Sequence, residues 1–70
     1  MNLGFIGTGK IASSVITGVY TSKISFKKIL VSPRNKAVAK NLKKKFTKVD
    51  IAKNNQEIVD KCDWVFLSIT

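Results

Sequence analysis

The chain alternates short apolar runs with longer amphipathic segments. The runs at residues 3–6, 28–31, 49–52 and 64–69 have the length and apolar content of buried strands. The last run is apolar throughout, as in strands that are covered on both faces of a parallel sheet. Apolar side chains recur at helical spacing between the runs. The pattern therefore predicts the order β-α-β-α-β-α-β, with right-handed crossovers and a parallel sheet.

The helices are predicted from their apolar faces and their ends. Asn35 is a candidate N-cap of the second helix. Asn54, followed by Glu57, resembles a capping box built on Asn and begins a third helix that ends near Lys61. The apolar faces consist of Ile11, Val15, Ile16 and Val19 in the first helix, and of Val38, Leu42 and Phe46 in the second.

Two glycines lie inside predicted elements. Gly4, in the first run, marks a close approach of backbone or helix to the strand. Gly18, inside the first helix, costs about 1 kcal/mol relative to alanine, so we expect a packing reason for it.

Residues 7–12 read Gly-Thr-Gly-Lys-Ile-Ala, which has the Gly-x-Gly-x-x-Ala spacing of a dinucleotide-binding turn. Gly7 lets the chain leave the strand in a conformation that most residues resist, and Gly9 removes a Cβ that would hold a pyrophosphate away. Ala12 lets the helix pack close to the strand. The free amides of the first helical turn then face the phosphates, at the positive end of the helix dipole. The alternative is a tight turn that contributes to packing and binds no dinucleotide.

Together these elements predict an α/β fold, a Rossmann-type doubly wound parallel sheet with strand order 3-2-1-4. Its ligand crevice opens beside the first strand, at the switch point. Because the fold is incomplete, we expect residues 1–70 to be the N-terminal half of a nucleotide-binding domain. We expect a missing segment of a longer enzyme to cover the apolar edge at 64–69.

The residues about 20 positions beyond the glycine turn predict which dinucleotide binds. NAD-binding units place a carboxylate there, whereas NADP-binding units place arginine and small polar groups. This chain has Ser32 and Arg34 at that point, and its first acidic residue is Asp50. Since a guanidinium can fork onto a 2′-phosphate, the sequence favours NADPH over NADH. The alternatives are a solvated Arg34 and a Ser32 that only caps a helix.

The formal net charge of +9, from 13 lysine and arginine residues against 4 acidic ones, raises the question of a nucleic-acid partner. The lysines are spread over several elements, and helical periodicity places the only run, at 43–45, on a solvated face. No aromatic side chains that could stack on bases are interleaved with them. We therefore expect no nucleic-acid partner, and attribute the charge to a lysine-rich proteome or to a bound polyanionic cofactor.

The cellular location is predicted from the cysteine content and the lack of leader-like or membrane-spanning segments. Cys62 is the only cysteine, so no intrachain disulfide can form. Without a histidine to activate it, we expect a structural thiol. No stretch has the features of a signal peptide or the length of a membrane span. The expected protein is soluble and cytoplasmic, with no membrane partner.

Five short motifs occur together over essentially the whole chain. They are Gly4-Phe5-Ile6-Gly7-x-Gly9-Lys10-x-Ala12, Ile16-x-Gly18, Val31-Ser32-x-Arg34, Asn55-x-Glu57-x-Val59 and Asp63-x-Val65-Phe66-Leu67. In this combination the chain resembles the N-terminal cofactor-binding part of pyrroline-5-carboxylate reductases. The glycine turn alone is shared with 3-hydroxyacid dehydrogenases and deazaflavin-dependent reductases. Those NADP-dependent oxidoreductases remain alternatives, as does a basic nucleic-acid or NADPH-binding module without catalysis.

The resemblance implies an enzyme that reduces 1-pyrroline-5-carboxylate to L-proline with NADP(H). It also implies a role for each matched position. The pyrophosphate would be held by Gly7, Thr8, Gly9, Lys10, Ile11 and Ala12, the 2′-phosphate by Ser32 and Arg34, the adenosine end by Asn55, and the crevice would be lined by Leu67, Ser68 and Ile69. For Asn55, a place beside a helix cap is an equal alternative. For Lys10, the alternative is a side chain that points to solvent, and the residues by themselves favour it.

The resemblance breaks off at the end of the fourth run. Where the family usually has Ala-Val-Lys-Pro, this chain has Ser68, Ile69 and Thr70. Family members also carry a helical C-terminal domain that dimerises and supplies the substrate pocket and the proton donor. We therefore expect no catalytic residue and no metal ligand in these 70 residues, no activity from them alone, and a homo-oligomer for the full-length protein.

Overall fold

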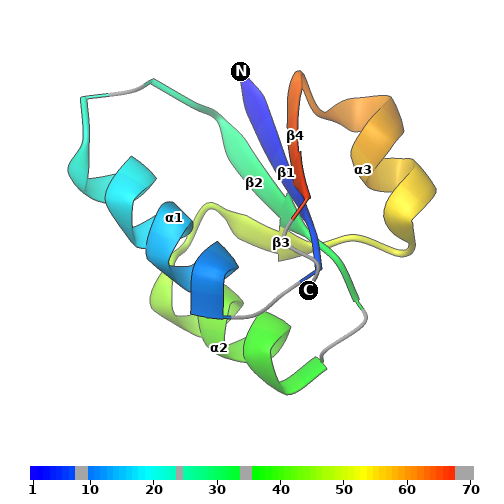
Figure 1. The fold of residues 1–70 in the computed structure, drawn as a ribbon, viewed down its shortest axis with the longest axis horizontal. Coiled ribbons are helices and arrows are strands. Elements are labelled where there is room, and N and C mark those ends of the chain that lie inside the picture. Colours follow the sequence, from blue (N-terminus) through cyan, green and yellow to red (C-terminus); the bar gives the residue numbers. More distant parts are fainter. Residues whose placement is uncertain (8–9, 24, 34–35, 68–70) are drawn as a thin grey trace.

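A computed structural model describes residues 1–7, 10–23, 25–33 and 36–67, with only the backbone described for 10–12. Its strands form one parallel sheet in the order β3-β2-β1-β4 (Figure 1). The predicted Rossmann-type fold is thereby confirmed. The elements are β1 (Asn2–Ile6), α1 (Lys10–Thr21), β2 (Lys28–Val31), α2 (Lys36–Lys45), β3 (Val49–Ile51), α3 (Asn55–Lys61) and β4 (Trp64–Leu67).

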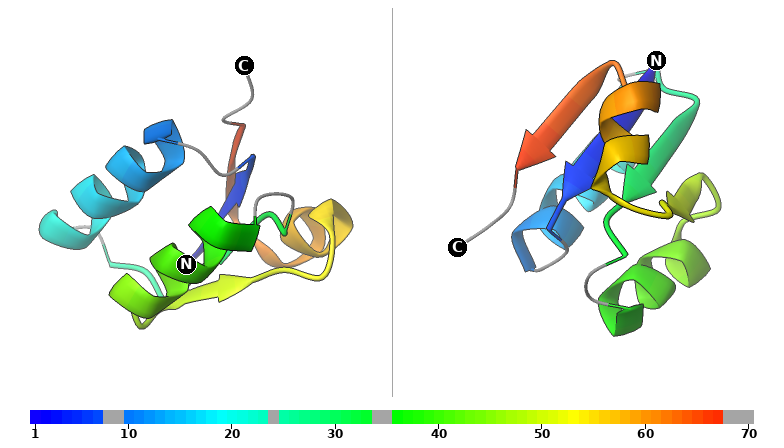
Figure 2. Two further views of the ribbon diagram at one scale, coloured as in Figure 1. Left: turned by 90° about the horizontal axis from the view of Figure 1, so that it is seen from below. Right: turned by 90° about the vertical axis from the view of Figure 1, so that its right-hand side faces the viewer.

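The helices cover the sheet from both sides. Figure 2 shows α1 and α2 on one face and α3 on the other. Side chains alternate between the two faces of a strand, so every second residue of β1, β2 and β3 points toward α1 and α2. The buried cluster on that side consists of Leu3, Phe5, Ile29, Val31 and Val49 from the strands, and of Ile16, Val19, Ala39 and Leu42 from the helices.

The opposite face is packed closely where α3 crosses β1. A Cβ built on Gly4 would lie 2.8 Å from Sγ of Cys62 and closer still to Cγ2 of Ile58. No real Cβ tolerates such contacts, so α3 can approach β1 only because residue 4 is glycine. The close approach expected at Gly4 is confirmed. The packing reason expected for Gly18 is wrong, because a Cβ there would meet nothing within 4 Å.

Most of the predicted element bounds agree with the structure. The strand at 28–31 begins and ends as predicted, β1 begins one residue earlier, and β3 ends at Ile51, one residue sooner. Asn54 caps α3 as predicted, since its side chain accepts a 2.9 Å hydrogen bond from the amide of Glu57. The Glu57 carboxylate accepts from the amide of Lys53 instead of that of Asn54, at 2.9 Å. The capping box therefore closes one residue earlier than usual.

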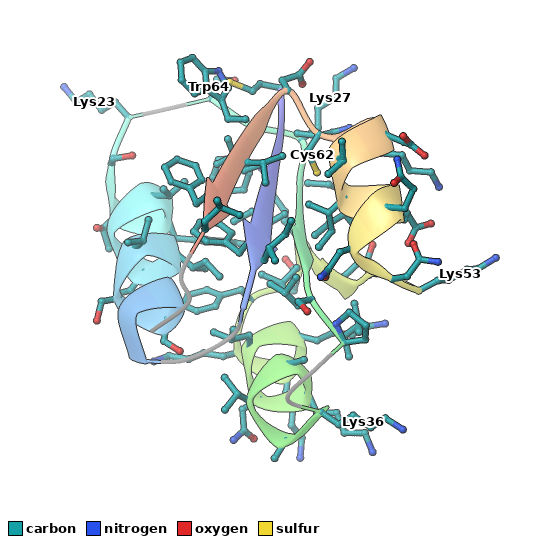
Figure 3. The ribbon with its side chains drawn as sticks, turned by 45° about the vertical axis from the view of Figure 1, so that its right-hand side comes forward. Lys23, Lys27, Lys36, Lys53, Cys62 and Trp64 are labelled. Carbon is teal, nitrogen blue, oxygen red and sulfur yellow. The ribbon has the colours of Figure 1, made fainter. Side chains whose placement is uncertain are left out.

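The fourth strand differs most from its prediction. Its sequence suits a strand covered on both faces, but the exposed fractions of Trp64 and Leu67 are 60% and 68%. The reason is that β4 is an edge strand of the described sheet, paired only with β1. Trp64 lies near the rim of the molecule in Figure 3. Phe66 retains one close partner, because its ring stacks on that of Phe5 with centroids 5.0 Å apart.

Candidate cofactor site

The carboxyl ends of the parallel strands meet at one edge of the sheet. Phe5, Val31 and Ile51 lie level with one another, and Ile6 lies opposite Leu67. The connection from β1 to β2 runs through α1 on one face of the sheet, whereas the connection from β3 to β4 runs through α3 on the other face. β1 lies between β2 and β4, so the two connections diverge at its carboxyl end. This is the switch point at which open α/β sheets bind ligands.

Gly7 forms the turn at the end of β1. Its φ angle of 88° is the only positive one among the described residues. Residues with a Cβ adopt this conformation rarely, so the turn depends on glycine. The predicted role of Gly7 in the turn geometry is confirmed, and its contact with a pyrophosphate remains a prediction.

The helix that follows this turn begins at Lys10. Lys10, Ile11 and Ala12 form its first turn, where backbone amides have no intrahelical acceptor. A short glycine turn leading into such a helix start fits the diphosphate of a dinucleotide. The predicted contacts of Thr8 and Gly9 lie outside the described residues.

Ser32 follows β2 at the same edge of the sheet. Its amide donates a 2.9 Å hydrogen bond to the carbonyl of Phe5, which extends the β1–β2 ladder by one residue. The residue is buried, with 1% of its surface exposed. Because α2 begins only at Lys36, Ser32 is not its cap. The predicted roles of Arg34 in phosphate binding and of Asn35 in capping lie outside the described residues.

Asn55 and Leu67 complete the described part of the predicted site. Asn55 is the exposed first residue of α3, and the capping role belongs to its neighbour Asn54. Leu67 ends β4 beside Ile6 and is largely exposed at the carboxyl end of the strand, and its contact with a cofactor remains a prediction. Ser68 and Ile69, the other predicted lining residues, lie outside the described part of the chain.

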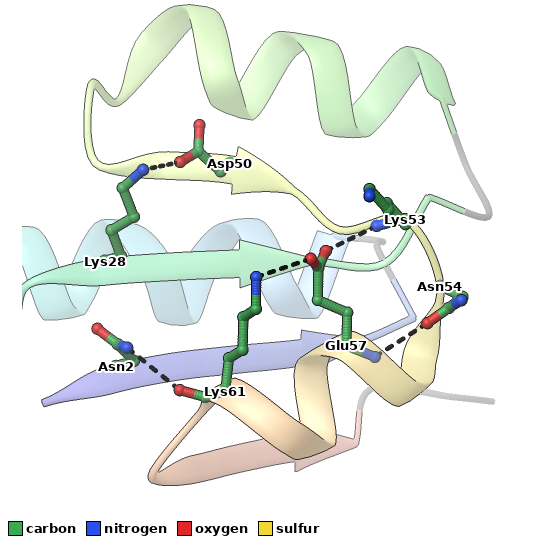
Figure 4. A network of polar contacts seen from close by, with 7 residues as sticks. All are labelled: Asn2, Lys28, Asp50, Lys53, Asn54, Glu57 and Lys61. Carbon is green, nitrogen blue, oxygen red and sulfur yellow. Dashed lines mark hydrogen bonds and ion pairs between the residues drawn. The ribbon is translucent and has the colours of Figure 1, made fainter.

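The carboxylates of Asp50 and Glu57 are both engaged by lysines (Figure 4). Asp50 pairs with Lys28 and, at 3.6 Å, with Lys43. The hydrogen bond from Lys28 is the main cause that holds the pKa of Asp50 below its ordinary value, and the charges of both lysines add to it.

Glu57 has a comparable set of donors at the start of α3. Its hydrogen bond from the Lys53 amide, followed by that from Lys61 at 3.1 Å, lowers the pKa of this carboxyl. Burial raises the pKa of the Cys62 thiol, which agrees with a structural thiol. All four acidic residues of the chain lie between positions 50 and 63. The connections from β1 to α1 and from β2 to α2 therefore contain no carboxylate that would repel a bound phosphate.

A hollow that sequence reasoning missed lies between α1 and α2. Its polar residues are spaced i, i+4 on each helix, with Ser13 and Thr17 on α1 and Asn41 and Lys45 on α2. That spacing was the available signal, but nothing in the sequence showed that the two helix faces meet.

Comparison with known protein families gives a match over almost the whole chain. The family described as NADP oxidoreductase coenzyme F420-dependent matches residues 2–70. The chain belongs to this family. The family match and the sheet topology together identify an oxidoreductase domain for a nicotinamide-type or F420-type cofactor. No curated protein and no solved structure matches the chain. Within the described ranges, no helix is both long and apolar enough to cross a bilayer.

Proposed function

We propose that the chain is the N-terminal cofactor-binding part of an NADPH-dependent reductase that converts 1-pyrroline-5-carboxylate to L-proline. The observation that carries the proposal is the positive-φ turn at Gly7, between β1 and α1 at the switch point of the sheet. The family match over residues 2–70 supports the same assignment. When bound, the nicotinamide supplies a hydride to the carbon of the ring C=N bond. The amides of the first turn of α1 hold the diphosphate. A second domain supplies the substrate pocket and the proton donor.

The distribution of charge supports NADPH over NADH. No acidic residue occurs before Asp50, so the segment after β2 has no carboxylate for the ribose hydroxyls. Arg34 follows β2 in the sequence and has the forked geometry that binds a phosphate through two charge-assisted hydrogen bonds. The proposed 2′-phosphate ligands are Ser32 and Arg34.

Substitution of Arg34 tests this assignment. Because one charge-assisted contact is lost, we expect Arg34→Ala to weaken NADPH binding by about 1.5–3 kcal/mol and to leave NADH binding nearly unchanged. Isothermal titration of both cofactors measures the difference. Lys40→Ala, which removes a cation one turn into α2, is the control and should change neither affinity by more than about twofold. Equal losses of NADPH and NADH binding would show that Arg34 does not bind the phosphate.

A second candidate function follows from the family description. Coenzyme F420 is a deazaflavin, and the description favours a reductase that passes a hydride between F420 and NADP. Assays of the full-length protein that contains this chain distinguish the two candidate functions. NADPH oxidation that depends on 1-pyrroline-5-carboxylate supports the first, whereas NADP reduction that depends on reduced F420 supports the second.

A further inference from the structure

The chain leaves β2 and β3 at the same level of the carboxyl edge of the sheet. Val31 and Ile51 are register partners, and the amide of Ala52 extends the pairing with a 2.9 Å hydrogen bond to the carbonyl of Val31. Ser32 and Ala52 are both buried, with 1% and 2% of their surface exposed. Neighbouring strands lie about 4.8 Å apart. Lys53, the exposed residue that follows Ala52, therefore lies beside the connection from β2 to α2.

The backbone of Lys53 is held in place just before α3. Its amide donates a 2.9 Å hydrogen bond to the Glu57 carboxylate, and the amide of Glu57 donates to the side chain of Asn54, also at 2.9 Å. Figure 4 shows these two bonds around the turn that lies next to the end of β2. The position of Lys53 is thus fixed by the fold, whereas its flexible four-carbon side chain can still reach toward a ligand.

The ammonium of Lys53 forms no ion pair with any described residue. Lys53 lines a hollow of about 330 Å³ that also contains Asp50 and Glu57. Asp50 pairs with Lys28, and Glu57 pairs with Lys61. The hydrogen bond from the Lys53 amide is the main cause that lowers the pKa of Glu57, whereas the charge of Lys53 comes last among the causes. The positive charge of Lys53 is therefore available to a bound anion.

We propose that Lys53 is a second cation for the 2′-phosphate of NADPH and helps to distinguish NADPH from NADH. The inference rests on the proposed function, because it requires the adenosine end of the cofactor to lie at the carboxyl ends of β2 and β3. A phosphate monoester carries a charge of about −1.5 to −2 at pH 7, which one guanidinium does not balance. Arg34 in the connection from β2 and Lys53 in the connection from β3 together supply two positive charges.

Isothermal titration of NADPH and NADH into the full-length protein that contains this chain tests the assignment. Because one charged contact with the 2′-phosphate is lost, Lys53→Gln should weaken NADPH binding by about threefold to tenfold. NADH has no 2′-phosphate, so its affinity should change by less than about twofold. Lys53→Arg keeps the positive charge and should retain most of the affinity for NADPH.

Lys27→Gln is the matched control for the change of net charge. Lys27 is also exposed and has no ion pair among the described residues, but it directly precedes β2 and so lies at the amino ends of the strands. In Figure 3 it lies at the end of the molecule opposite Lys36. Since salt at physiological strength screens exposed charges beyond about 8 Å, Lys27→Gln should change the affinity for either dinucleotide by less than about twofold.

The outcomes separate this inference from the function on which it rests, once circular dichroism shows that the variants are folded. If the wild type prefers NADPH and Arg34→Ala removes the preference, but Lys53→Gln behaves like Lys27→Gln, the role of Lys53 is refuted and the cofactor assignment stands. Equal losses of NADPH and NADH affinity in Lys53→Gln also refute a contact with the 2′-phosphate. If the wild type does not bind NADPH more tightly than NADH, the inference fails together with the proposed cofactor.

Discussion

At the scale of the residue, two glycines differ in whether the fold requires the absence of a Cβ. Gly4 lies under α3, where Ile58 and Cys62 leave no space for a Cβ, whereas Gly18 lies on the open side of α1. The sequence predicted a packing role for both. Periodicity shows that Gly18 lies within a helix, but it does not show whether a neighbouring element covers that side.

The same substitution at these two positions is expected to have opposite effects. Gly4→Ala forces the new methyl group into Ile58 and Cys62, so it should lower the free energy of unfolding by about 1–3 kcal/mol. Gly18→Ala improves helix propensity without a clash and should raise the free energy of unfolding by up to about 1 kcal/mol. Urea titration followed by circular dichroism measures both. Destabilisation by Gly18→Ala would contradict the open space beside this glycine.

At the scale of the element, the order of strands and helices was predictable, but the ion pairs between them were not. Apolar spacing and the Asn54 cap locate α3 because these signals lie within a few residues of each other. Asp50 pairs with Lys28, 22 positions earlier, because the register of β2 and β3 places Asp50 opposite Leu30, and Lys28 lies two residues before Leu30 on the same face of the sheet. Local sequence patterns do not contain that register.

The Asp50 pairs should make stability depend on pH. Because the pKa of Asp50 is lowered in the fold, its ion pairs stabilise the protein above the ordinary carboxyl pKa of about 4. That contribution is lost as the pH falls through the folded pKa. In Asp50→Asn, the free energy of unfolding should be lower by about 1 kcal/mol or less at pH 7, with a shallower fall below pH 4.

Denaturant titrations between pH 2 and pH 7 measure this difference. Asp60→Asn is the control, since Asp60 has no ion pair among the described residues and accepts only from Gln56, at 2.9 Å. The free energy of unfolding of Asp50→Asn should therefore approach that of the wild type only at the acid end of this range. An unchanged slope below pH 4 in Asp50→Asn would contradict a stabilising role for these pairs.

At the scale of the whole molecule, the apolar surface of β4 could be predicted only in part. Trp64 and Leu67 are typical of a covered strand, but their exposure depends on which elements lie beside the strand. The glycine turn was predictable because Gly7 and the start of α1 at Lys10 are only three positions apart in the chain. The residues of the predicted site that do lie far apart, Gly7, Ser32 and Leu67, meet at one edge because of the parallel topology.

The exposed edge should cause self-association. An apolar edge strand without charged residues is a template for further strand pairing. We expect Leu67→Lys to shift the chain toward monomer in sedimentation velocity. Val59→Lys adds the same charge at an apolar position that is 55% exposed but belongs to α3 and not to the unpaired strand, so it should have a smaller effect. A wild-type chain that stays monomeric at high concentration would contradict this expectation.

The place of β1 in the sheet has a consequence for synthesis on the ribosome. β1 is translated before the other strands, yet it occupies an interior position between β2 and β4. Its second neighbour is complete only when Leu67 has been translated. Until then, one side of β1 has no backbone partner from β4, and the contacts that close this side span most of the sequence. The nascent chain can therefore form the β1–β2–β3 unit first, while the turn at Gly7 gains β4 as a neighbour of its strand last.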